Sequence, residues 1–479
     1  MSRFNVIAAL SVALLMACPG PTTGTDGGDD AGLDAGLDAG AVDAGQKDLD
    51  VVLVRLNGDG TVDSTFGAAG VARFDLGAAT GSARDSLYGM TKDASGRLVL
   101  FGSTKASGRS DVDRFIARVT SAGALDSTFG SGGLARLDRA GSNDSPRHGL
   151  VQTDGKIVMS GYTSLPTGVP LTDGGVQSAN QIILHRVTAD GVNDATFGDG
   201  GVVEVAHFVP AMPATTLWGM AEAYGVVQQS SGRYVTAGYG RRAASGAVDL
   251  VSFRYENDGR IDSSWATGGD FVLDLIGGDE RGRHAVVLPD DRVVVLGSGV
   301  PLSAGNVDPM VVMLTADGAA DTTFDTDGVK TWSFGRNDEA WLGGAVGPGN
   351  LVLAAAGYRT GPANTDGEND DATLLLLPLS TGAPAEFAQP VPLSATAHDR
   401  FLGVAWDGNK VVAVGFVREG ADTKFAAARF NGDGSRDTTF GTGGVVTFNV
   451  AEGAGTEEVA RWVVVQADGK IVLGGVAEH

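Results

Sequence analysis

Residues 57–67 read NGDGTVDSTFG, and the same pattern returns six more times along the chain. Each copy is a short turn rich in Asp and Gly that is followed by an aromatic residue. Repetition at a nearly fixed period indicates a repeat architecture, in which each unit needs its neighbours to bury a hydrophobic core. The intervals are 63, 68, 68, 59, 63 and 53 residues between aromatics at Phe66, Phe129, Phe197, Trp265, Phe324, Phe387 and Phe440.

Four strand patterns can be assigned in each unit, most clearly near the end of the chain. They are WVVVQADG at 462–469, KIVLGG at 470–475, FAAARFN at 425–431 and GVVTF at 444–448. Val, Ile and Phe fill these segments, whereas Gly, Asp and Asn bound them, which is typical of short strands joined by tight turns. No stretch has a sustained helical period, so we expect an all-β domain over residues 48–479.

The repeated turn has a structural explanation. Asp-Gly between apolar segments favours a hairpin, because Gly adopts positive φ without strain. A second Asp follows three residues later and can accept hydrogen bonds from backbone N–H groups of its own turn. We expect the aromatic residue to pack between neighbouring units. The sixth copy, GAPAEFAQP at 382–390, lacks the second Asp kept at Asp63, Asp126, Asp194, Asp262, Asp321 and Asp437, which favours a structural role over a catalytic one.

The two ends of the repeat array are out of phase. The array begins with a third-strand pattern at 50–57 and ends with a second-strand pattern at 470–475. Each end therefore supplies strands that the other lacks, and pairing them would close a ring without exposed edges. An open β-solenoid would instead need capping ends, and none is visible. The sequence predicts a seven-bladed β-propeller of four-stranded blades, closed by pairing of N- and C-terminal strands.

The segments NGDGTVDSTFG, DGKIVMSG, NGDGSRDTTFG and ADGKIVLGG resemble the bacterial delta-60 repeat family over about residues 48–479. This resemblance implies a seven-bladed propeller and brings no catalytic residues with it. Together with the N-terminal features described next, it makes the chain similar to secreted lipoproteins of the myxobacterial type.

Residues 1–17 have the composition of a secretory signal peptide. Arg3 precedes the apolar segment IAALSVALLMA, which is too short for a permanent transmembrane helix. The string Leu15-Met16-Ala17-Cys18 resembles a bacterial lipobox, which implies acylation of Cys18. This residue is the single cysteine of the chain and has no intrachain disulfide partner. The alternative is a plain signal peptide with an incidental cysteine.

Residues 18–47 contain the acceptor cysteine and a low-complexity segment of Asp, Ala and Gly. This composition buries too little apolar surface to fold, so we expect a disordered stalk. A Gly-rich coil of this length spans on the order of 30 Å. Anchor and stalk together predict a lipid-anchored protein of the cell envelope, at the outer membrane or the cell surface, with palmitate or a similar acyl chain on Cys18.

Acidic residues precede the first strand of most units, and the third unit lacks one. If this strand lined the central channel, the acids would form a ring at one mouth that could bind a cation or a polyhydroxylated ligand. The alternative is that these acids pair with nearby arginines or cap turns. The acids are Asp85, Asp144, Glu280, Asp338, Asp399 and Glu458, and the arginines are Arg84, Arg147, Arg283, Arg336, Arg400 and Arg461.

Calcium is a second candidate ligand. Asn57, Asp59, Thr61 and Asp63 alternate as they would in an oxygen-ligand loop, but the copy at 120–123 has lost these residues and the bidentate Glu of an EF-type loop is missing. Hairpin chemistry explains the residues without a metal, so we expect neither a metal nor another cofactor. His148 and His284 occupy nearly equivalent places in first strands, and a structural role is the simpler interpretation.

The net charge of −23 excludes a nucleic-acid binder of the usual basic kind. The chain contains no HExxH, GxSxG or GxxxxGK motif. We therefore expect a monomeric, non-enzymatic binding or scaffold module for a protein or glycan ligand. The alternative is a propeller-type polysaccharide hydrolase or lyase that uses acids at the channel mouth. Function is expected where the repeats differ, in loops 162–180, 207–217 and 358–371.

Overall fold

The computed structural model of the chain places the repeat array in one compact unit within Val42–His479. The structure describes residues 48–77, 84–105, 111–139, 142–170, 176–205, 221–241, 247–275, 278–300, 306–335, 338–360, 370–380, 383–395, 397–451 and 456–478. The signal peptide, Cys18, the stalk and the loop at 207–217 lie outside the described residues. None of the helical segments in the described part has the length and apolar character needed to cross a membrane.

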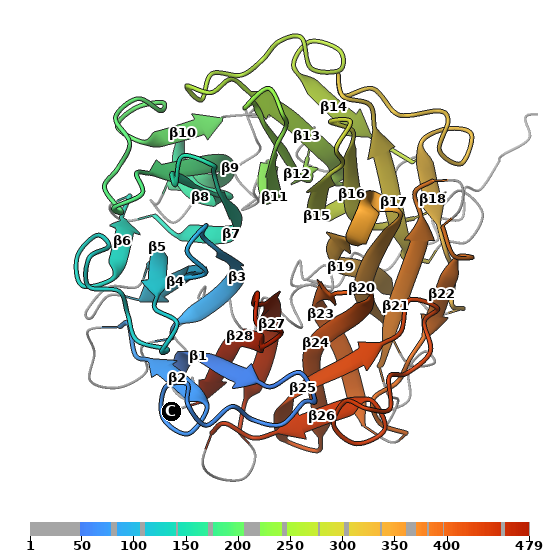
Figure 1. The fold of residues 1–479 in the computed structure, drawn as a ribbon. Coiled ribbons are helices and arrows are strands. Elements are labelled where there is room, and N and C mark those ends of the chain that lie inside the picture. The colour runs from blue at the N-terminus through green and yellow to red at the C-terminus, as the bar shows by residue number, and fades with distance from the viewer. Residues whose placement is uncertain are drawn as a thin grey trace, which may run out of the picture. The chain divides into compact units, whose positions relative to one another are not determined.

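Seven four-stranded antiparallel sheets form a ring in which each sheet is one blade, as Figure 1 shows. Blade 1 joins both ends of the chain and contains β1 (Leu49–Leu56), β2 (Val71–Phe74), β27 (Glu458–Val465) and β28 (Ile471–Glu478). Blade 2 contains β3 (Ser86–Lys92), β4 (Leu98–Lys105), β5 (Val112–Val119) and β6 (Leu134–Leu137). Blade 3 contains β7 (Asp144–Val151), β8 (Ile157–Pro170), β9 (Val176–Val187) and β10 (Val202–Val205). The predicted all-β propeller fold is therefore confirmed.

The remaining blades follow in chain order. Blade 4 contains β11 (Ala221–Gln228), β12 (Tyr234–Gly240), β13 (Asp249–Tyr255) and β14 (Asp270–Leu273). Blade 5 contains β15 (Arg281–Val287), β16 (Val293–Gly299), β17 (Asp308–Leu314) and β18 (Val329–Thr331). Blade 6 contains β19 (Glu339–Val346), a 3₁₀ turn η2 (Pro348–Asn350), β20 (Val352–Arg359), β21 (Asp371–Pro378) and β22 (Phe387–Pro390). Blade 7 contains β23 (His398–Asp407), β24 (Lys410–Glu419), β25 (Asp422–Phe430) and β26 (Val445–Phe448).

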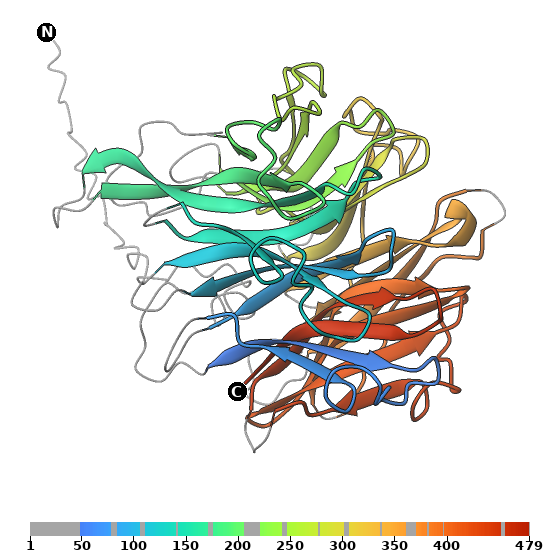
Figure 2. The same ribbon diagram turned by 60° about the vertical axis from the view of Figure 1, so that its left-hand side comes forward.

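The ring closes through the two ends of the repeat array. Strand β1 pairs antiparallel with β28 from Leu49 opposite Glu478 to Leu56 opposite Ile471. The N-terminal strand pair thus completes the sheet that the C-terminal strand pair begins, as the out-of-phase ends predict. The strands β8 and β9 are 14 and 12 residues long, and their hairpin extends beyond the neighbouring strands (Figure 2).

In five copies of the repeated turn, an arginine of the preceding strand forms a buried ion pair with the second Asp, and the Arg55 guanidinium also donates to the carbonyl of Ser121 in the next blade. Arg55 Nε donates to Asp63 Oδ2 at 2.7 Å, and the Arg55 guanidinium lies 4.7 Å from the centre of the Phe66 ring. Asp63 Oδ1 accepts from the N–H and hydroxyl of Thr65 at 3.2 and 2.7 Å, which fixes the turn. The same arrangement recurs at Arg118–Asp126–Phe129, Arg186–Asp194–Phe197, Arg254–Asp262–Trp265 and Arg429–Asp437–Phe440.

Within the described residues, six of the seven repeated aromatic residues, all except Phe324, pack against a glycine of the next blade. Gly123 has φ of +89°, and a Cβ on it would lie 3.1 Å from the Phe66 ring. The N–H of Gly67 donates to the carbonyl of Ala122 at 2.9 Å beside this contact. In the sixth copy, which lacks the Asp, a Cβ on Gly434 would lie 2.4 Å from Phe387. The expectation of aromatic packing between units is confirmed, and at these turns glycine is needed for both its φ and its size.

Candidate ligand site at the propeller axis

Each innermost strand contains a β-bulge near its start. The innermost strands β3, β7, β11, β15, β19, β23 and β27 surround the axis of the ring in Figure 1, and every one of them shifts register against its neighbour by an added residue or two. A bulge re-aims the side chain of the added residue. The added residues are Tyr88, Arg147 with His148, Tyr224, Arg283, Leu342, Leu402 and Arg461.

Five of these bulge residues form a continuous stack across blades 1 to 5, which we name the Arg–Tyr arc: Arg461, Tyr88, Arg147, Tyr224 and Arg283. The guanidinium of Arg147 lies 5.0 Å from the ring centre of Tyr88 and 4.4 Å from that of Tyr224. Arg461 lies 5.3 Å from the Tyr88 ring, and Arg283 lies 5.0 Å from the Tyr224 ring. Each such cation–π contact contributes on the order of 0.5–2 kcal/mol, so the arc holds its own geometry.

The three arginines of the Arg–Tyr arc contribute positive charge, and Arg147 has a buried carboxylate nearby. Arg147 Nη2 donates to the Tyr224 hydroxyl at 3.0 Å and lies 3.8 Å from the buried carboxylate of Glu222. Glu222 also accepts from the Tyr239 hydroxyl at 3.0 Å. Glu222 thus places a buried carboxylate beside the Arg147 guanidinium. Tyr88, Tyr224 and Arg461 remain partly exposed, so solvent reaches the arc.

A cluster of three rings fills the axis next to the arc. The centre of the His148 ring lies 4.9 Å from that of His284 and 4.4 Å from that of Trp462. The ring centres of His284 and Trp462 are 5.1 Å apart. These residues come from blades 3, 5 and 1, which are not adjacent, so the contacts cross the axis. Burial lowers the pKa of His284 to about 4 and that of His148 well below its usual range. Both histidine rings are therefore neutral at pH 7, and the cluster adds no charge next to the arc.

The acids that precede the first strands are buried and hold the loop before them. Asp144 Oδ2 accepts from the Arg139 N–H at 2.8 Å, and Asp399 Oδ2 accepts from the Ser394 N–H at 3.0 Å. Asp85 and Glu458 accept backbone N–H groups in the same way from Leu76 and from Val450 with Ala451. This arrangement fits the turn-capping alternative. The exposed fraction is 1% for Asp85 and 0% for Asp144, Glu280, Asp399 and Glu458.

The register corrects one position of this set. The acid stands three residues before the added residue of the bulge in blades 1, 2, 3, 5 and 7, and in blade 6 that place belongs to Glu339, which accepts from the Phe334 N–H at 2.8 Å. Asp338 instead accepts from the Tyr358 hydroxyl at 3.0 Å. In blade 4 the place is occupied by Ala221, which agrees with the missing acid of the third unit.

Burial raises the pKa of several of these carboxyl groups, because the charged form is desolvated. The pKa reaches about 7 for Asp85 and Glu280 and about 6 for Asp399, with burial as the largest cause in each case. Neighbouring acids raise it further, namely Asp75 and Asp50 beside Asp85. Burial also raises the pKa of Asp144 and Glu458.

In the hairpin at residues 57–61, the polar side chains hydrogen-bond to one another. Asn57 Nδ2 donates to the Thr61 hydroxyl at 2.9 Å, and this hydroxyl donates to Asp59 Oδ1 at 2.7 Å. Asp63 points away into its ion pairs with Arg55 and Lys470. These hydrogen bonds stabilise the hairpin turn, as the sequence suggests. They do not suit a metal, because the side-chain amide of Asn57 places a donor where a cation would need an oxygen ligand.

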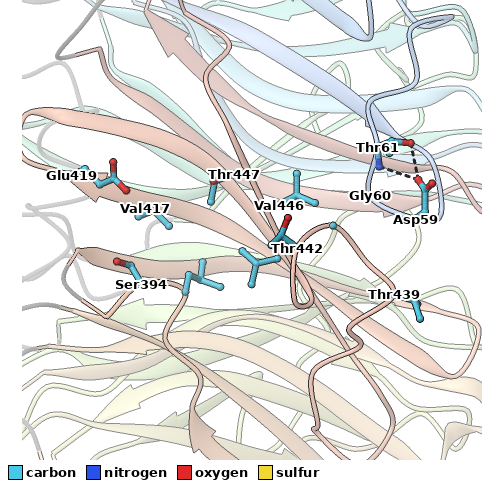
Figure 3. Close-up of a pocket in the computed structure, with 13 residues that line it drawn as sticks. Asp59, Gly60, Thr61, Ser394, Val417, Glu419, Thr439, Thr442, Val446 and Thr447 are labelled. Carbon is cyan, nitrogen blue, oxygen red and sulfur yellow. Dashed lines mark hydrogen bonds between the residues drawn. The ribbon is translucent and has the colours of Figure 1, made fainter.

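A cleft of about 700 Å³ lies on the outer part of blade 7, where it meets the first turn of blade 1 (Figure 3). Its lining includes Asp59, Thr61, Glu419 and Thr442. Asp59 is bonded to Thr61, and Glu419 forms an ion pair with Lys424 at 2.8 Å. The charged groups of this cleft therefore serve local structure, and the Arg–Tyr arc remains the stronger site.

The sequence pattern did not find the Arg–Tyr arc. Arg147, Arg283 and Arg461 are visible in the sequence only as neighbours of acids, and Tyr88 and Tyr224 carry no signal there. Four of these residues share one place, three positions after the acid, namely Tyr88, Arg147, Arg283 and Arg461. Aligning the units on the acid would have placed them in one ring, but the bulge that turns them to the axis has no sequence marker.

Comparison with known proteins agrees with the propeller fold. A family described as "Domain of unknown function (DUF5122) beta-propeller" matches residues 44–66, 288–324 and 407–440. No curated protein matches the chain. Among solved structures, Sqt1 from Chaetomium thermophilum is 14% identical, with 83% of this chain and 96% of that chain covered and a TM-score of 0.41. An α-L-arabinanase from Penicillium chrysogenum is 10% identical, with 72% and 93% covered and a TM-score of 0.42.

Proposed function

We propose that this protein is a binding module of the cell envelope that holds an oxyanion-bearing ligand, an acidic glycan, at the Arg–Tyr arc. The observation that carries the proposal is the arc itself: three arginines and two tyrosines at the bulge positions of five successive blades. Guanidinium groups match carboxylate and sulfate geometry, and their stacking on tyrosine fixes them before a ligand arrives. Preorganised donors of this kind lower the entropic cost of binding.

The N-terminal segments complete the proposal. Lipidation of Cys18 would anchor the chain, and the stalk at 19–47 would carry the propeller away from the membrane surface. The repeat sequences and the lipobox support assignment to the delta-60 repeat lipoproteins of the myxobacterial type. We place the protein at the outer membrane or the cell surface and infer that it acts as a monomer.

The hydrolase or lyase alternative receives less support from the site. Paired carboxylates for glycoside chemistry must face the substrate. The oxygens of Asp144, Asp399 and Glu458 instead accept backbone N–H groups of their own loops. A binding role needs no such carboxylate pair, and the cationic arc supplies its contacts.

The experiment is calorimetric titration of the full chain, purified in detergent, with polygalacturonate and with fully methyl-esterified polygalacturonate. The two polymers share one backbone and differ in charge. We expect binding to the acidic polymer alone, and binding that weakens as salt rises, because the contact is between opposite charges. Arg461→Gln should weaken it at least about tenfold, a loss of about 1.4 kcal/mol.

Arg418→Gln is the matched control, because Arg418 is an exposed arginine of β24 outside the arc. It should bind as the wild type does. Equal binding of both polymers, or equal loss in Arg418→Gln and Arg461→Gln, would refute a site at the arc. Release of new reducing ends from either polymer would support the hydrolase alternative instead.

A further inference from the structure

The bulge position of the innermost strands is cationic or aromatic in blades 1 to 5 and apolar in blades 6 and 7. Its two apolar residues are Leu342 of β19 and Leu402 of β23. They stand three positions after Glu339 and Asp399, which is the place that the Arg–Tyr arc occupies in its own blades. In Figure 1, β19 and β23 surround the same axis as the strands of the arc. The arc and the two leucines, which we name the leucine pair, therefore form one ring with two chemically different sides.

The leucine pair keeps part of its surface open to solvent. The residues directly before it, Trp341 and Phe401, are fully buried members of the hydrophobic cores of blades 6 and 7. Leu342 and Leu402 are instead partly exposed. A single partly exposed leucine is ordinary in a folded protein, but here two occupy the same place in adjacent blades. The pair thus presents apolar surface beside a polar site.

Close backbone packing joins the leucine pair to the arc. A Cβ on Gly343, directly after Leu342, would lie 2.8 Å from the carbonyl oxygen of Leu402. A Cβ on Gly403, directly after Leu402, would lie 2.8 Å from the carbonyl oxygen of Arg461. Glycine permits both approaches because it has no Cβ. The apolar side of the ring therefore borders Arg461, which is the end of the arc.

An acidic glycan without substituents would match only one side of this ring. Its carboxylates suit the guanidinium groups of the arc, but its hydroxyl groups would face the leucine pair. A hydroxyl group that leaves water for an apolar surface loses its hydrogen bonds, which is unfavourable. An acetyl ester on such a hydroxyl removes the donor and adds a methyl group, while the carboxylates keep their charge. A methyl ester on the carboxylate would instead abolish the charge that the arc binds.

We propose that the ligand is an acidic glycan whose hydroxyl groups carry acetyl esters, with its carboxylates at the arc and its acetyl methyl groups against Leu342 and Leu402. This inference rests on the proposed function and adds a second recognition element to the same site. Burial of one methyl group favours binding about fourfold. The leucine pair therefore sets a preference among acidic glycans, whereas the arc provides the charge contacts that all of them share.

The test is calorimetric titration of the full chain with polygalacturonate and with O-acetylated polygalacturonate, at equal carboxylate concentration and ionic strength. The measured quantity is the ratio of the two affinities. We expect the wild type to bind the acetylated polymer at least about fourfold more tightly. Leu402→Asn replaces the apolar contact by an amide of similar size and should bring the ratio to about one. Leu342→Asn tests the same ratio at the other leucine, so the result does not depend on the folding of one variant.

Leu351→Asn is the matched control, because Leu351 is a leucine of blade 6 that is 41% exposed and lies outside the bulge position. It should keep the wild-type ratio. Equal affinity of the wild type for the two polymers, or a wild-type ratio in both Leu402→Asn and Leu342→Asn, would overturn the inference and leave a site at the arc standing. Binding of neither polymer would overturn the proposed function and the inference together.

Discussion

The N–H of Gly441 donates a hydrogen bond of 2.8 Å to the carbonyl of Asp59, and this bond joins the last repeat to the first. Phe440 lies beside it, and a Cβ on Gly60 would approach this ring to 3.2 Å. Arg429 also donates to the carbonyl of Gly58. The backbone hydrogen bond that blades 1 to 4 make with their successors is therefore made at the closure as well, which accounts for a ring without an open edge.

The addition of a single methyl group at the closure tests how much packing there contributes to the stability of the propeller. Gly60→Ala should destabilise the propeller by about 2–4 kcal/mol, since it combines a positive φ with overpacking against Phe440. Gly96→Ala is the control, because Gly96 has φ of +78° but nothing within 4 Å of an added Cβ. It should cost only about 1–2 kcal/mol. Equal losses for both variants in urea unfolding would show that packing at the closure is unimportant.

Of the two aspartates in the repeated turn, the one that forms the buried ion pair should be the more sensitive to substitution. Asp63→Asn leaves the Arg55 guanidinium buried without its counter-charge and should cost about 3–5 kcal/mol. Asp59→Asn changes an exposed carboxylate of the same hairpin and should cost about 1 kcal/mol or less. Urea unfolding of the two variants beside the wild type measures both. A loss in Asp63→Asn no larger than that in Asp59→Asn would contradict the role given to the pair.

Asp85 should make stability depend on pH in an unusual direction. Its pKa is about 7 in the folded protein and 3.8 in its ordinary state, so the folded chain keeps a proton that the unfolded chain loses. The stabilisation is complete below the ordinary pKa and is lost as pH rises through the folded one. Asp85→Asn should therefore destabilise the protein at pH 5 and be less harmful, or even stabilising, at pH 8.

The difference between wild type and variant must be measured, because buried histidines such as His284 act in the opposite direction. Asp59→Asn is the control, since hydrogen bonds from Thr61 lower the pKa of Asp59 and its contribution should be constant between pH 5 and 8. A pH-independent difference for Asp85→Asn in chemical unfolding would show that this carboxyl group is not perturbed.

The proposed lipidation of Cys18 has a direct chemical test. Cys18→Ser removes the thiol that acylation requires, so the protein should move from the membrane fraction to the soluble fraction. Fractionation of cells with immunoblotting measures this change, and metabolic labelling with an alkyne-tagged fatty acid should lose its signal in the variant. Retention of the variant in membranes would argue against lipidation.

The repeat made much of the fold predictable. A turn such as NGDGTVDSTFG specifies a hairpin locally, and its recurrence specifies the blades. The closure followed from the phase of the two ends and is confirmed by the pairing of Leu49 with Glu478. Even the sixth copy kept its aromatic contact at Phe387 after losing its Asp. These features depend on neighbours in sequence or on the period, and both are readable from one chain.

The site was harder to predict, because it depends on register. Whether Asp338 or Glu339 continues the series of acids is decided by a shift of one residue, which reverses the face of a strand. Tyr224 turns toward the axis because of a bulge between Ala223 and Gly225, and no residue type announces that bulge. The contact of His148 with Trp462 joins blades far apart in sequence, and no local pattern encodes it.

The bulge of the innermost strands separates recognition from folding. The aromatic residue, the ion pair and the glycines of each unit maintain the ring, whereas the side chain added by the bulge forms no part of that repeated set. Arginine, tyrosine and leucine therefore all occur at this place in one molecule, for example at Arg283, Tyr224 and Leu402. A protein built in this way can change its specificity one blade at a time, because a substitution at one bulge leaves the contacts that maintain the ring unchanged.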